Sequence, residues 1–470
     1  MADMDGKRLV QAALRREAVP RVPWVPFAGV HAGSLAGYAA DEMLRDGEKL
    51  SRSLDEVVRR YQPDGMPVVF DLQLEAEILG CELLWASQAP PSVKSHPLAG
   101  TREIPRLSIG KDQGRVPLVL AAARRLRERV GESVAIYGLF CGPLTLASHL
   151  RGPRIFSDMK KDPEYLVSLL AECAGVSRTM AAFWREAGAD VAVPVDPLVF
   201  QISPAHFAAF CRAPYAGLFD AIRAGGILSS FFVCGNAAKN IAAMCETGPD
   251  GISVDENLDM IRTKKITDAH GVSLGGNIPL TTVMMFGSKE DNVRYVLEML
   301  STLSPAGLVI SPGCDMPYDL PPENAEACAR AVRDPEAARM SQPGRGAAPP
   351  PAPAESEEEA GTDPGSRMAG TEAYGTRSKP TVELYTLDPE SCAACTYMRD
   401  VWQAAREQLG DTAHWEAYQY NRKEEVARIR QRGIGHLPSV YVDGELWYDS
   451  LIPPVEELVE RIREAAGKTR

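Results

Sequence analysis

The residues best suited to chemistry are a pair of cysteines, Cys392 and Cys395, separated by two alanines. A strand pattern ends before the pair and a helical pattern begins at it. Unpaired N–H groups at a helix start stabilise a thiolate, so Cys392 should have a lowered pKa and act as the nucleophile. Cys395, one turn further, is placed to resolve a mixed disulfide. The pair predicts thiol–disulfide chemistry; half of a zinc site is the alternative, but no second Cys or His pair lies nearby to complete it.

Two more cysteines, Cys234 and Cys314, lie in glycine-containing stretches that follow strand-like runs. Cys234 precedes Gly235-Asn236, and Cys314 belongs to Pro312-Gly313-Cys314-Asp315. If both loops lie at the same end of a parallel sheet, the two thiols can together bind a soft metal or another soft ligand. The alternative is that each is a small buried side chain, the commonest fate of an isolated cysteine.

Composition narrows the class of partner. Acidic residues outnumber basic residues by 63 to 51, which gives a formal net charge of −12. Nucleic acids and anionic membranes attract basic surfaces, so neither is an expected partner. We also find no run of roughly 18 uncharged apolar residues, the length that crosses a bilayer, and no signal-peptide pattern in Met1–Arg16. The ten thinly spread cysteines fit a reducing compartment, and we expect a cytoplasmic protein.

Strand-like runs alternate with amphipathic helical patterns through residues 1–340. The longest helical patterns are Tyr165–Ala187, Ala205–Ala224 and Lys289–Leu303. Eight strands, most of them followed by a helix, predict an α/β fold of the (β/α)8 TIM barrel type. A doubly wound open sheet is the alternative, although no Gly-x-Gly-x-x-Gly follows the early strands. The expected strands are Val22–Phe27, Met66–Phe70, Ser133–Gly138, Val191–Val195, Ile227–Val233, Gly251–Val254, Val272–Gly275 and Gly307–Ile310.

Active sites of such barrels form at the carboxyl ends of the strands. The side chains at those ends that suit hydrogen-bonding, acid–base or metal chemistry are Asp71, Cys141, Asp196, Cys234, Asp255, Glu256, Asn277 and Cys314. Glu75 and His149 lie on segments that follow two of the strands. We therefore expect the functional site at this end of the barrel.

Residues 341–378 separate the barrel from a second domain. They contain Pro349-Pro350-Pro351 and the acidic run Glu355–Glu359, a composition that cannot bury enough apolar surface to offset its ordering entropy. We predict a mobile linker there. The following residues, 379–470, have the order strand, helix, helix, strand, strand, helix of one small α/β domain. The expected elements are Thr381–Thr386, Cys395–Leu409, Lys423–Arg432, Ser439–Val442, Leu446–Tyr448 and Pro454–Ala466, with a hairpin turn at Asp443-Gly444.

The Cys-x-x-Cys pair and the stretch His436-Leu437-Pro438-Ser439 resemble the thioredoxin/glutaredoxin family over residues 379–470. The resemblance implies a thioredoxin-like fold in which Pro438, usually cis in the family, faces the dithiol and contacts its client. The Ala-Ala spacer and Ser391, where thioredoxins commonly have Trp, depart from the family pattern. A dedicated client is therefore expected rather than general disulfide reduction.

Residues 6–333 resemble the uroporphyrinogen decarboxylase superfamily, and within it the corrinoid-dependent methyltransferases of the methylcobamide:coenzyme M type. This resemblance implies a (β/α)8 barrel and a methyl-corrinoid as methyl donor. It rests on stretches spread in the family's order along the barrel: Phe70-Asp71-Leu72 with Glu75-Ala76-Glu77, Gly142-Pro143-Leu144-Thr145, Asp196-Pro197, Cys234-Gly235-Asn236, Gly275-Gly276-Asn277-Ile278, and Gly313-Cys314-Asp315 with Pro321-Pro322-Glu323-Asn324.

The decarboxylase branch fits poorly, because Pro23–Gly33 contains no arginine for substrate carboxylates. The methyltransferase branch binds zinc through His-x-Cys and a distant Cys, which map to Phe232, Cys234 and Cys314. Phenylalanine cannot ligate a metal, so a zinc ion or another thiophilic metal would need a third ligand. That ligand would come from the substrate or from one of Cys141, Asp71, Glu75 and His149.

The resulting hypothesis is methyl transfer from a methyl-corrinoid, such as methylcobalamin, to a thiolate or other thiophilic acceptor held by Cys234 and Cys314. Asp196 and Asn277 would orient the acceptor, Asp71, Glu75 and His149 would bind it, and Cys392 with Cys395 would act in its reduction or release. No Asp-x-His-x-x-Gly pattern is present, so a separate corrinoid protein is an expected partner. The alternatives are soft metal or metalloid binding without methyl transfer, and methyl transfer to a pterin.

Overall fold

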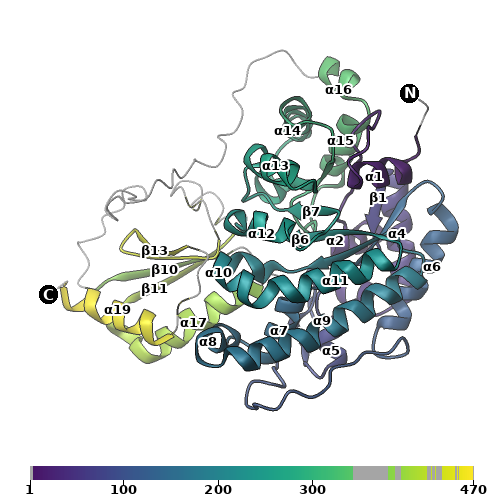
Figure 1. Ribbon diagram of the computed structural model, residues 1–470. Helices are drawn as coiled ribbons and strands as arrows, with labels where there is room; N and C mark the ends of the chain where they lie inside the picture. Colours follow the sequence, from purple (N-terminus) through teal and green to yellow (C-terminus); the bar gives the residue numbers. More distant parts are fainter. Residues whose placement is uncertain are drawn as a thin grey trace. The chain divides into compact units, whose positions relative to one another are not determined.

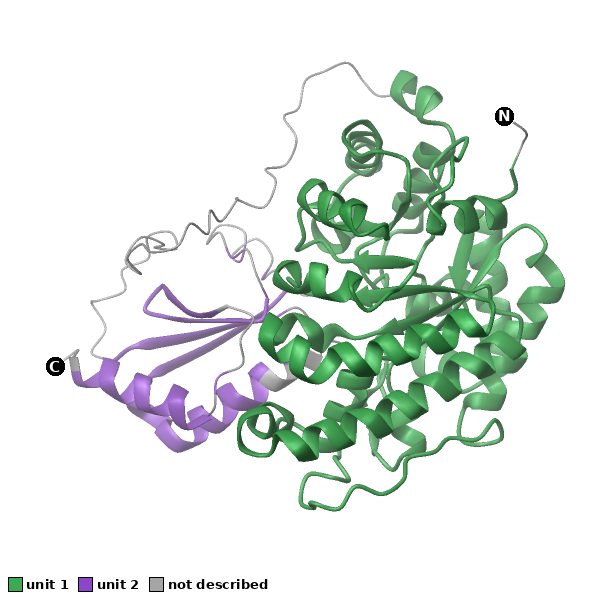
Figure 2. Cartoon of the chain, in the orientation of Figure 1, with its two compact units in different colours: residues 1–343 green, residues 344–470 purple. Residues whose placement is uncertain are grey.

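The computed structural model describes residues 4–341, 379–386, 393–420, 437–449 and 455–468, together with residues 425, 429, 434 and 453. The chain divides into two compact units, residues 1–343 and 344–470 (Figure 2). The predicted linker, apart from Ser341, lies outside the described residues. Each unit is therefore described by itself.

Unit 1 is built on a parallel sheet of seven strands in the order β1-β4-β5-β6-β7-β8-β9, and helices lie around it (Figure 1). Nearly all strand residues are buried, as in parallel sheets covered by helices. The prediction of an α/β barrel-like fold is confirmed. The strands are β1 (Gly65–Pro67), β4 (Ala135–Cys141), β5 (Val191–Val195), β6 (Leu228–Val233), β7 (Gly251–Val254), β8 (Ser273–Ile278) and β9 (Leu308–Pro312), and a separate pair is β2 (Leu83–Leu84) with β3 (Ser92–Val93).

The helices of unit 1 agree with the predicted long patterns, except that Ala205–Ala224 is divided by a π-helical segment at Phe207–Cys211. The α-helices are α1 (Gly6–Leu14), α2 (Gly29–Ala36), α3 (Ala40–Leu44), α4 (Gly47–Tyr61), α5 (Leu74–Ile78), α6 (Val116–Val130), α7 (Pro143–Arg151), α8 (Arg154–Lys161), α9 (Pro163–Glu186), α10 (Pro204–His206), α11 (Arg212–Ala224), α12 (Ile241–Cys245), α13 (Met260–Ala269), α14 (Lys289–Thr302), α15 (Pro322–Arg333) and α16 (Pro335–Ser341).

The first predicted strand, Val22–Phe27, forms a single bridge from Trp24 to Ile310 of β9. The N–H of Ile310 donates to the Pro23 carbonyl over 3.0 Å, and on the other side the N–H of Asp64, next to β1, donates to the Trp24 carbonyl over 2.9 Å. The segment thus lies between the two edge strands and occupies the eighth position of the ring. Its prolines have no N–H groups, so the expected regular strand was wrong.

The inward side chains of the curled sheet form an apolar core that includes Tyr137 and Leu139 of β4, Val193 of β5 and Val309 of β9. Strand residues two apart share a face, so these positions define the interior of the barrel. The interior row continues along each strand to the carboxyl end, where the predicted site residues follow.

Helix α9 is long and apolar enough, by length and composition alone, to cross a membrane, although Glu172 and Arg178 interrupt its apolar residues. Half of the most apolar 18-residue stretch of this helix is buried, and the helix packs against β4, β5, α7 and α11. Trp184 is fully buried, and its indole N–H donates to the Leu139 carbonyl over 3.1 Å. These contacts make α9 a helix of the barrel's outer layer.

Unit 2 contains a four-stranded sheet in the order β11-β10-β12-β13. Strand β10 (Thr381–Thr386) pairs in parallel with β11 (His414–Gln419) and antiparallel with β12 (Ser439–Val442), which pairs with β13 (Glu445–Asp449). Helices α17 (Ala393–Leu409) and α19 (Val455–Lys468) contribute to its apolar core. The hairpin turn has positive φ at Asp443 and Gly444, and the Leu437-Pro438 bond is cis.

The sequence did not predict β11. It is a partly exposed edge strand, and its sequence, His-Trp-Glu-Ala-Tyr-Gln, has no β-branched residue to mark it as a strand. The other described strands and helices of unit 2 lie where the sequence placed them. Most of the predicted helix Lys423–Arg432 lies outside the described residues.

Candidate active site

The thiols of Cys234 and Cys314 meet at the carboxyl end of the barrel. Cys234 follows β6 and Cys314 follows β9, and their Sγ atoms lie 2.7 Å apart across 80 positions of sequence. Both side chains are partly exposed and pack on the apolar core of the interior. The pair therefore has a sulfur face open to a ligand and an apolar face beneath.

Phe232 lies at the position where the family resemblance has a ligand histidine, and it is fully buried. Its ring contacts Phe27 at 5.0 Å and Phe70 at 5.6 Å between centroids, both edge to face. These aromatic rings form a hydrocarbon floor in the same core cluster on which Cys234 and Cys314 pack. The floor excludes water from below the sulfurs and offers no ligand.

The Cys234 loop is held by a carboxylate from the neighbouring strand. The N–H of Gly235 donates to the carboxylate of Asp255, directly after β7, and the N–H of Asn257 donates to the same carboxylate over 3.0 Å. Burial raises the Asp255 pKa, which the hydrogen bonds from Gly235 and Asn257 oppose. Asp255 thus positions Cys234.

Asn277 supports this arrangement from β8. Its Nδ2 donates to the carbonyls of Asp255 and Leu258, each over 2.8 Å, while its Oδ1 is buried without a hydrogen-bond partner among the described residues. The side chain therefore braces the backbone beside the Cys234 loop. Only Oδ1 remains for the predicted contact with an acceptor.

The Cys314 loop is held by its own acidic residue. Asp315 accepts a hydrogen bond from the N–H of Gly29, at the start of α2, over 2.7 Å. Burial raises the pKa of Asp315 to about 8, although the backbone groups of Gly29, Val30 and Met316 oppose the rise. Each thiol therefore lies on a loop that a carboxyl group ties to a neighbouring element.

A second polar cluster surrounds Asp71, after β1. The carboxylate of Asp71 forms an ion pair with Arg115, and the Nε of Arg115 donates to Glu77 over 2.8 Å. Arg115 precedes α6 rather than following a strand, so no strand-end pattern in the sequence indicated it. Because Asp71 is buried and paired, it acts first as a partner of Arg115, and its predicted substrate contact stays a prediction.

Glu75, Cys141 and His149 are all buried in their uncharged forms near pH 7. Burial raises the pKa of Glu75 to about 8 and lowers that of His149 to about 4, and it raises the Cys141 pKa well above its ordinary value. The Cys141 N–H donates to Glu75 Oε1 over 3.3 Å, and Glu75 Oε2 has no partner among described residues. A neutral thiol and a neutral carboxylic acid are poor metal ligands.

Asp196, after β5, is fully buried and accepts hydrogen bonds at the start of α7. The N–H groups of Leu144 and Thr145 donate over 2.9 and 3.2 Å, the Thr145 hydroxyl donates over 2.6 Å, and the Tyr215 hydroxyl also donates. Asp196 therefore fixes α7 and α11 to the strand end. Its predicted role in orienting an acceptor has no support from these contacts.

The described residues do not fit a zinc site. Among them, no group of three or more His, Cys, Asp or Glu side chains is arranged to hold a metal ion. The predicted third ligands, Cys141, Asp71, Glu75 and His149, are not brought into such a group with the two thiols. Since zinc takes three or four protein ligands, Cys234 and Cys314 alone provide a two-thiol site.

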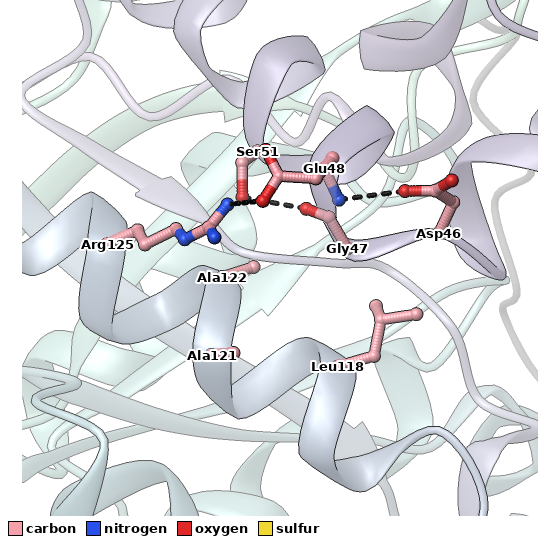
Figure 3. A pocket seen from close by; sticks show the side chains of 8 residues that line it. All are labelled: Asp46, Gly47, Glu48, Ser51, Leu118, Ala121, Ala122 and Arg125. Carbon is pink, nitrogen blue, oxygen red and sulfur yellow. Dashed lines mark hydrogen bonds and ion pairs between the residues drawn. The ribbon is translucent and has the colours of Figure 1, made fainter.

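The predicted site residues of unit 2 and the other cysteines of unit 1 are described next. Cys395 is buried in the first turn of α17, Pro438 is buried, and Cys392 lies outside the described residues. Five further thiols of unit 1 are buried, at Cys81, Cys173, Cys211, Cys245 and Cys328. A surface hollow between α4 and α6 is lined by Asp46, Glu48, Ser51 and Arg125, among others (Figure 3); it contains none of the predicted site residues.

Comparisons with known proteins identify relatives of unit 1. The family model described as uroporphyrinogen decarboxylase (URO-D) matches residues 5–335. The methylcobamide:CoM methyltransferase MtbA of Methanosarcina acetivorans is 28% identical over 335 residues, covering 69% of this chain and 97% of the relative. A uroporphyrinogen decarboxylase of Nostoc punctiforme is 24% identical, covering 57% and 76%. A solved methyltransferase structure from Methanosarcina mazei superposes with a TM-score of 0.64 at 25% identity, covering 71% of this chain and 99% of that one.

Proposed function

The chain belongs to the uroporphyrinogen decarboxylase family, and from this premise we propose that it transfers a methyl group from a methyl-corrinoid to a thiolate or another soft acceptor. Several relatives matched over nearly their whole length are methylcobamide:CoM methyltransferases, which supports methyl transfer over decarboxylation. The absence of arginine from Pro23–Gly33 also disfavours a substrate with many carboxylates.

The observation that carries the proposal is the 2.7 Å approach of the Cys234 and Cys314 sulfurs at the open end of the barrel. Partial exposure lets a donor reach the pair, while the aromatic floor keeps water away from its inner side. A methyl-corrinoid, when bound, supplies an electrophilic methyl group. The two thiols hold the acceptor in place, and Asp255 and Asp315 hold the loops of Cys234 and Cys314 in position.

Zinc has no part in this proposal. The same two-thiol geometry favours one alternative function, the binding of a soft metal or metalloid without methyl transfer, because linear and trigonal thiolate sites suit soft ions. A pterin acceptor, in contrast, would give the thiol pair no role.

We further propose that residues 379–470 form a thioredoxin-like domain and that Cys392 and Cys395 reduce or release a disulfide-bonded acceptor, or reduce a disulfide formed by the barrel thiols. The strand order β11-β10-β12-β13, with a parallel first pair and an antiparallel hairpin, supports this fold. The reduction transfers two electrons from the dithiol to a disulfide, so that two thiols and a new disulfide result.

The test combines the full chain, methylcobalamin and a panel of thiols, and follows the loss of methyl–cobalt absorbance. Cys234→Ser and Cys314→Ser should each slow this loss by at least about a hundredfold, roughly 2.7 kcal/mol. Cys245→Ala, a change at a buried thiol in α12, is the control and should keep the rate.

No thiol-dependent loss of the methyl–cobalt band with any acceptor would overturn the proposal. Elemental analysis of the same preparation separates the alternative: a soft metal or metalloid bound to the pair without corrinoid turnover would favour binding alone. Loss of the methyl–cobalt band with a reduced pterin as acceptor, at the same rate in the doubly substituted protein, would favour the pterin acceptor.

A further inference from the structure

Two buried polar side chains, Asn277 and Ser311, lie near the carboxyl ends of β8 and β9, the end of the barrel at which the thiol pair lies. In the parallel register, Gly275 of β8 pairs with Val309 of β9, and Asn277 pairs with Ser311. Val309 belongs to the interior core. Because residues two apart on a strand share a face, Ser311 also points inward, one row closer to the carboxyl end, and Asn277 is its partner in the register.

Cys234 belongs to the same row. Phe232 of β6 pairs with Ser253 of β7, which pairs with Gly275, so these three residues share the interior row of Val309. Cys234, two residues after Phe232, therefore lies in the next row with Asn277 and Ser311. The thiol pair and the two polar side chains thus lie at the same end of the barrel.

The orientation of the Asn277 amide is fixed by its own hydrogen bonds. Both Nδ2 hydrogens are used by two backbone carbonyls, those of Asp255 and Leu258, so the free atom is Oδ1. This oxygen and the Ser311 hydroxyl have no hydrogen-bond partner among the described residues, and exposure is 1% for Asn277 and 0% for Ser311. A buried polar atom without a partner costs free energy, which a ligand group of the right kind recovers.

The two unpartnered atoms determine which polar group a ligand must carry. An amide oxygen accepts hydrogen bonds only, so the ligand must donate through an N–H or O–H group; the Ser311 hydroxyl accepts or donates. The polar groups in the surroundings act in the same direction. Asp255 and Asp315 place carboxyl groups beside the two thiols, and the Arg115 guanidinium is already paired with Asp71 and Glu77.

We infer that the acceptor is a small thiol that carries a hydrogen-bond donor, an aminothiol or a hydroxythiol, and not a thiol with an anionic sulfonate. A sulfonate has no hydrogen to donate to Asn277 and meets carboxyl groups. That the bound thiol is methylated rests on the proposed function. The preference for thiols with a hydrogen-bond donor is a property of binding alone.

The experiment measures equilibrium binding of four two-carbon or three-carbon thiols to the reduced full chain by calorimetry. The probes are cysteamine, mercaptoethanol, propanethiol and mercaptoethanesulfonate, which differ in the group opposite the thiol. Cysteamine and mercaptoethanol should bind at least about tenfold more tightly than the other two. Equal affinity for propanethiol, or tighter binding of the sulfonate, overturns the inference.

Substitution of Ser311 tests whether this residue contributes to the preference for thiols that carry a hydrogen-bond donor. Ser311→Ala should reduce the preference for mercaptoethanol over propanethiol about five- to tenfold and leave propanethiol binding unchanged. Ser273→Ala is the matched control, since Ser273 lies in the same sheet, at the opposite end of β8, and its buried hydroxyl also has no partner in the described structure. An unchanged preference in Ser311→Ala, or an equal loss in both variants, contradicts the assignment.

Methyl–cobalt consumption with the same four thiols separates this inference from the proposed function. The predicted binding order without consumption would refute methyl transfer and support the binding site. Consumption at equal rates and equal affinities for all four would support methyl transfer and refute the preference.

Discussion

The amide N–H of Gly29 donates to Oδ1 of Asp315 over 2.7 Å, and this bond joins the start of α2 to the loop that carries Cys314. A Cβ atom at Gly29 would lie 2.4 Å from that oxygen and 2.6 Å from the Cβ of Phe70, a member of the aromatic floor. Glycine is needed here because two neighbours approach its backbone closely, one of them beside a site thiol.

Gly29→Ala should therefore disturb the site from a distance. Overpacking should lower the free energy of unfolding by about 1–3 kcal/mol, and displacement of the Cys314 loop should reduce thiol-dependent methyl transfer by more than about tenfold. Urea unfolding and the methyl–cobalt assay measure the two effects.

Gly217→Ala is the control for that substitution. Gly217 lies inside α11, where a Cβ meets nothing within 4 Å, so alanine should stabilise the protein by about 0.5–1 kcal/mol and leave activity unchanged. Equal loss of activity in both variants would show that contact with Asp315 is not the reason.

The sequence was informative about the thiol site because Cys234 and Cys314 each follow a strand, and parallel strands place their carboxyl ends at one edge. Position 232 was found through the spacing of the family's ligands. What the sequence did not show was the anchoring of each loop, because the bonds from Gly235 to Asp255 and from Gly29 to Asp315 join segments far apart in the chain.

The same limit explains the other differences. Arg115 precedes a helix, so no strand-end pattern pointed to it, and its pairing with Asp71 is set by tertiary packing. Alternation of residue types suggested a regular strand at Val22–Phe27, but backbone donors missing at its prolines leave a single bridge. Both cases depend on which groups meet in space rather than on local pattern.

The titration of Glu75 predicts how stability depends on pH. Burial raises its pKa from 4.5 to about 8, so between these values the folded state keeps a proton that the unfolded chain loses. Stability from this group is present below the lower value and is lost as pH rises towards the upper one. Glu75→Gln cannot ionise and should gain stability relative to the wild type as pH rises, by at most about 4 kcal/mol between pH 5 and 8.

Urea unfolding of both proteins across that range measures the difference. Asp315 titrates in the same window but is present in both proteins, so their difference isolates Glu75. Parallel pH profiles for wild type and variant would mean that Glu75 is ionised in the folded state.

The closeness of Cys234 and Cys314 predicts selective oxidation. Diamide should take two electrons and two protons from the pair and form one disulfide, because the other described barrel thiols are buried. Methyl transfer should stop and return after treatment with dithiothreitol. Peptide mapping should find the Cys234–Cys314 link; activity that persists in the linked protein would show that the free thiols are not needed.

Phe232→His should turn the two-thiol site into a metal site. The imidazole would stand two residues before Cys234, in the His-x-Cys spacing that the family resemblance implies for a zinc site, and would complete three ligands with Cys314. Zinc should rise to about one ion per chain by elemental analysis, while the metal-free variant should lose about 1–3 kcal/mol because the ring contacts with Phe27 and Phe70 are weakened.

Phe70→His is the matched control for that gain, because it places an imidazole in the same aromatic floor without the His-x-Cys spacing. It should lose similar stability and bind no additional zinc. Zinc uptake in both variants would mean that any histidine in the aromatic floor suffices. Uptake in neither would mean that the Cys234 and Cys314 loops hold their sulfurs in a geometry that a third ligand cannot complete.

Cobalt(II) bound to Phe232→His tests the ligand set directly. It should give the thiolate-to-cobalt absorption of a site with two sulfur ligands, and adding Cys314→Ser to this variant should abolish that absorption.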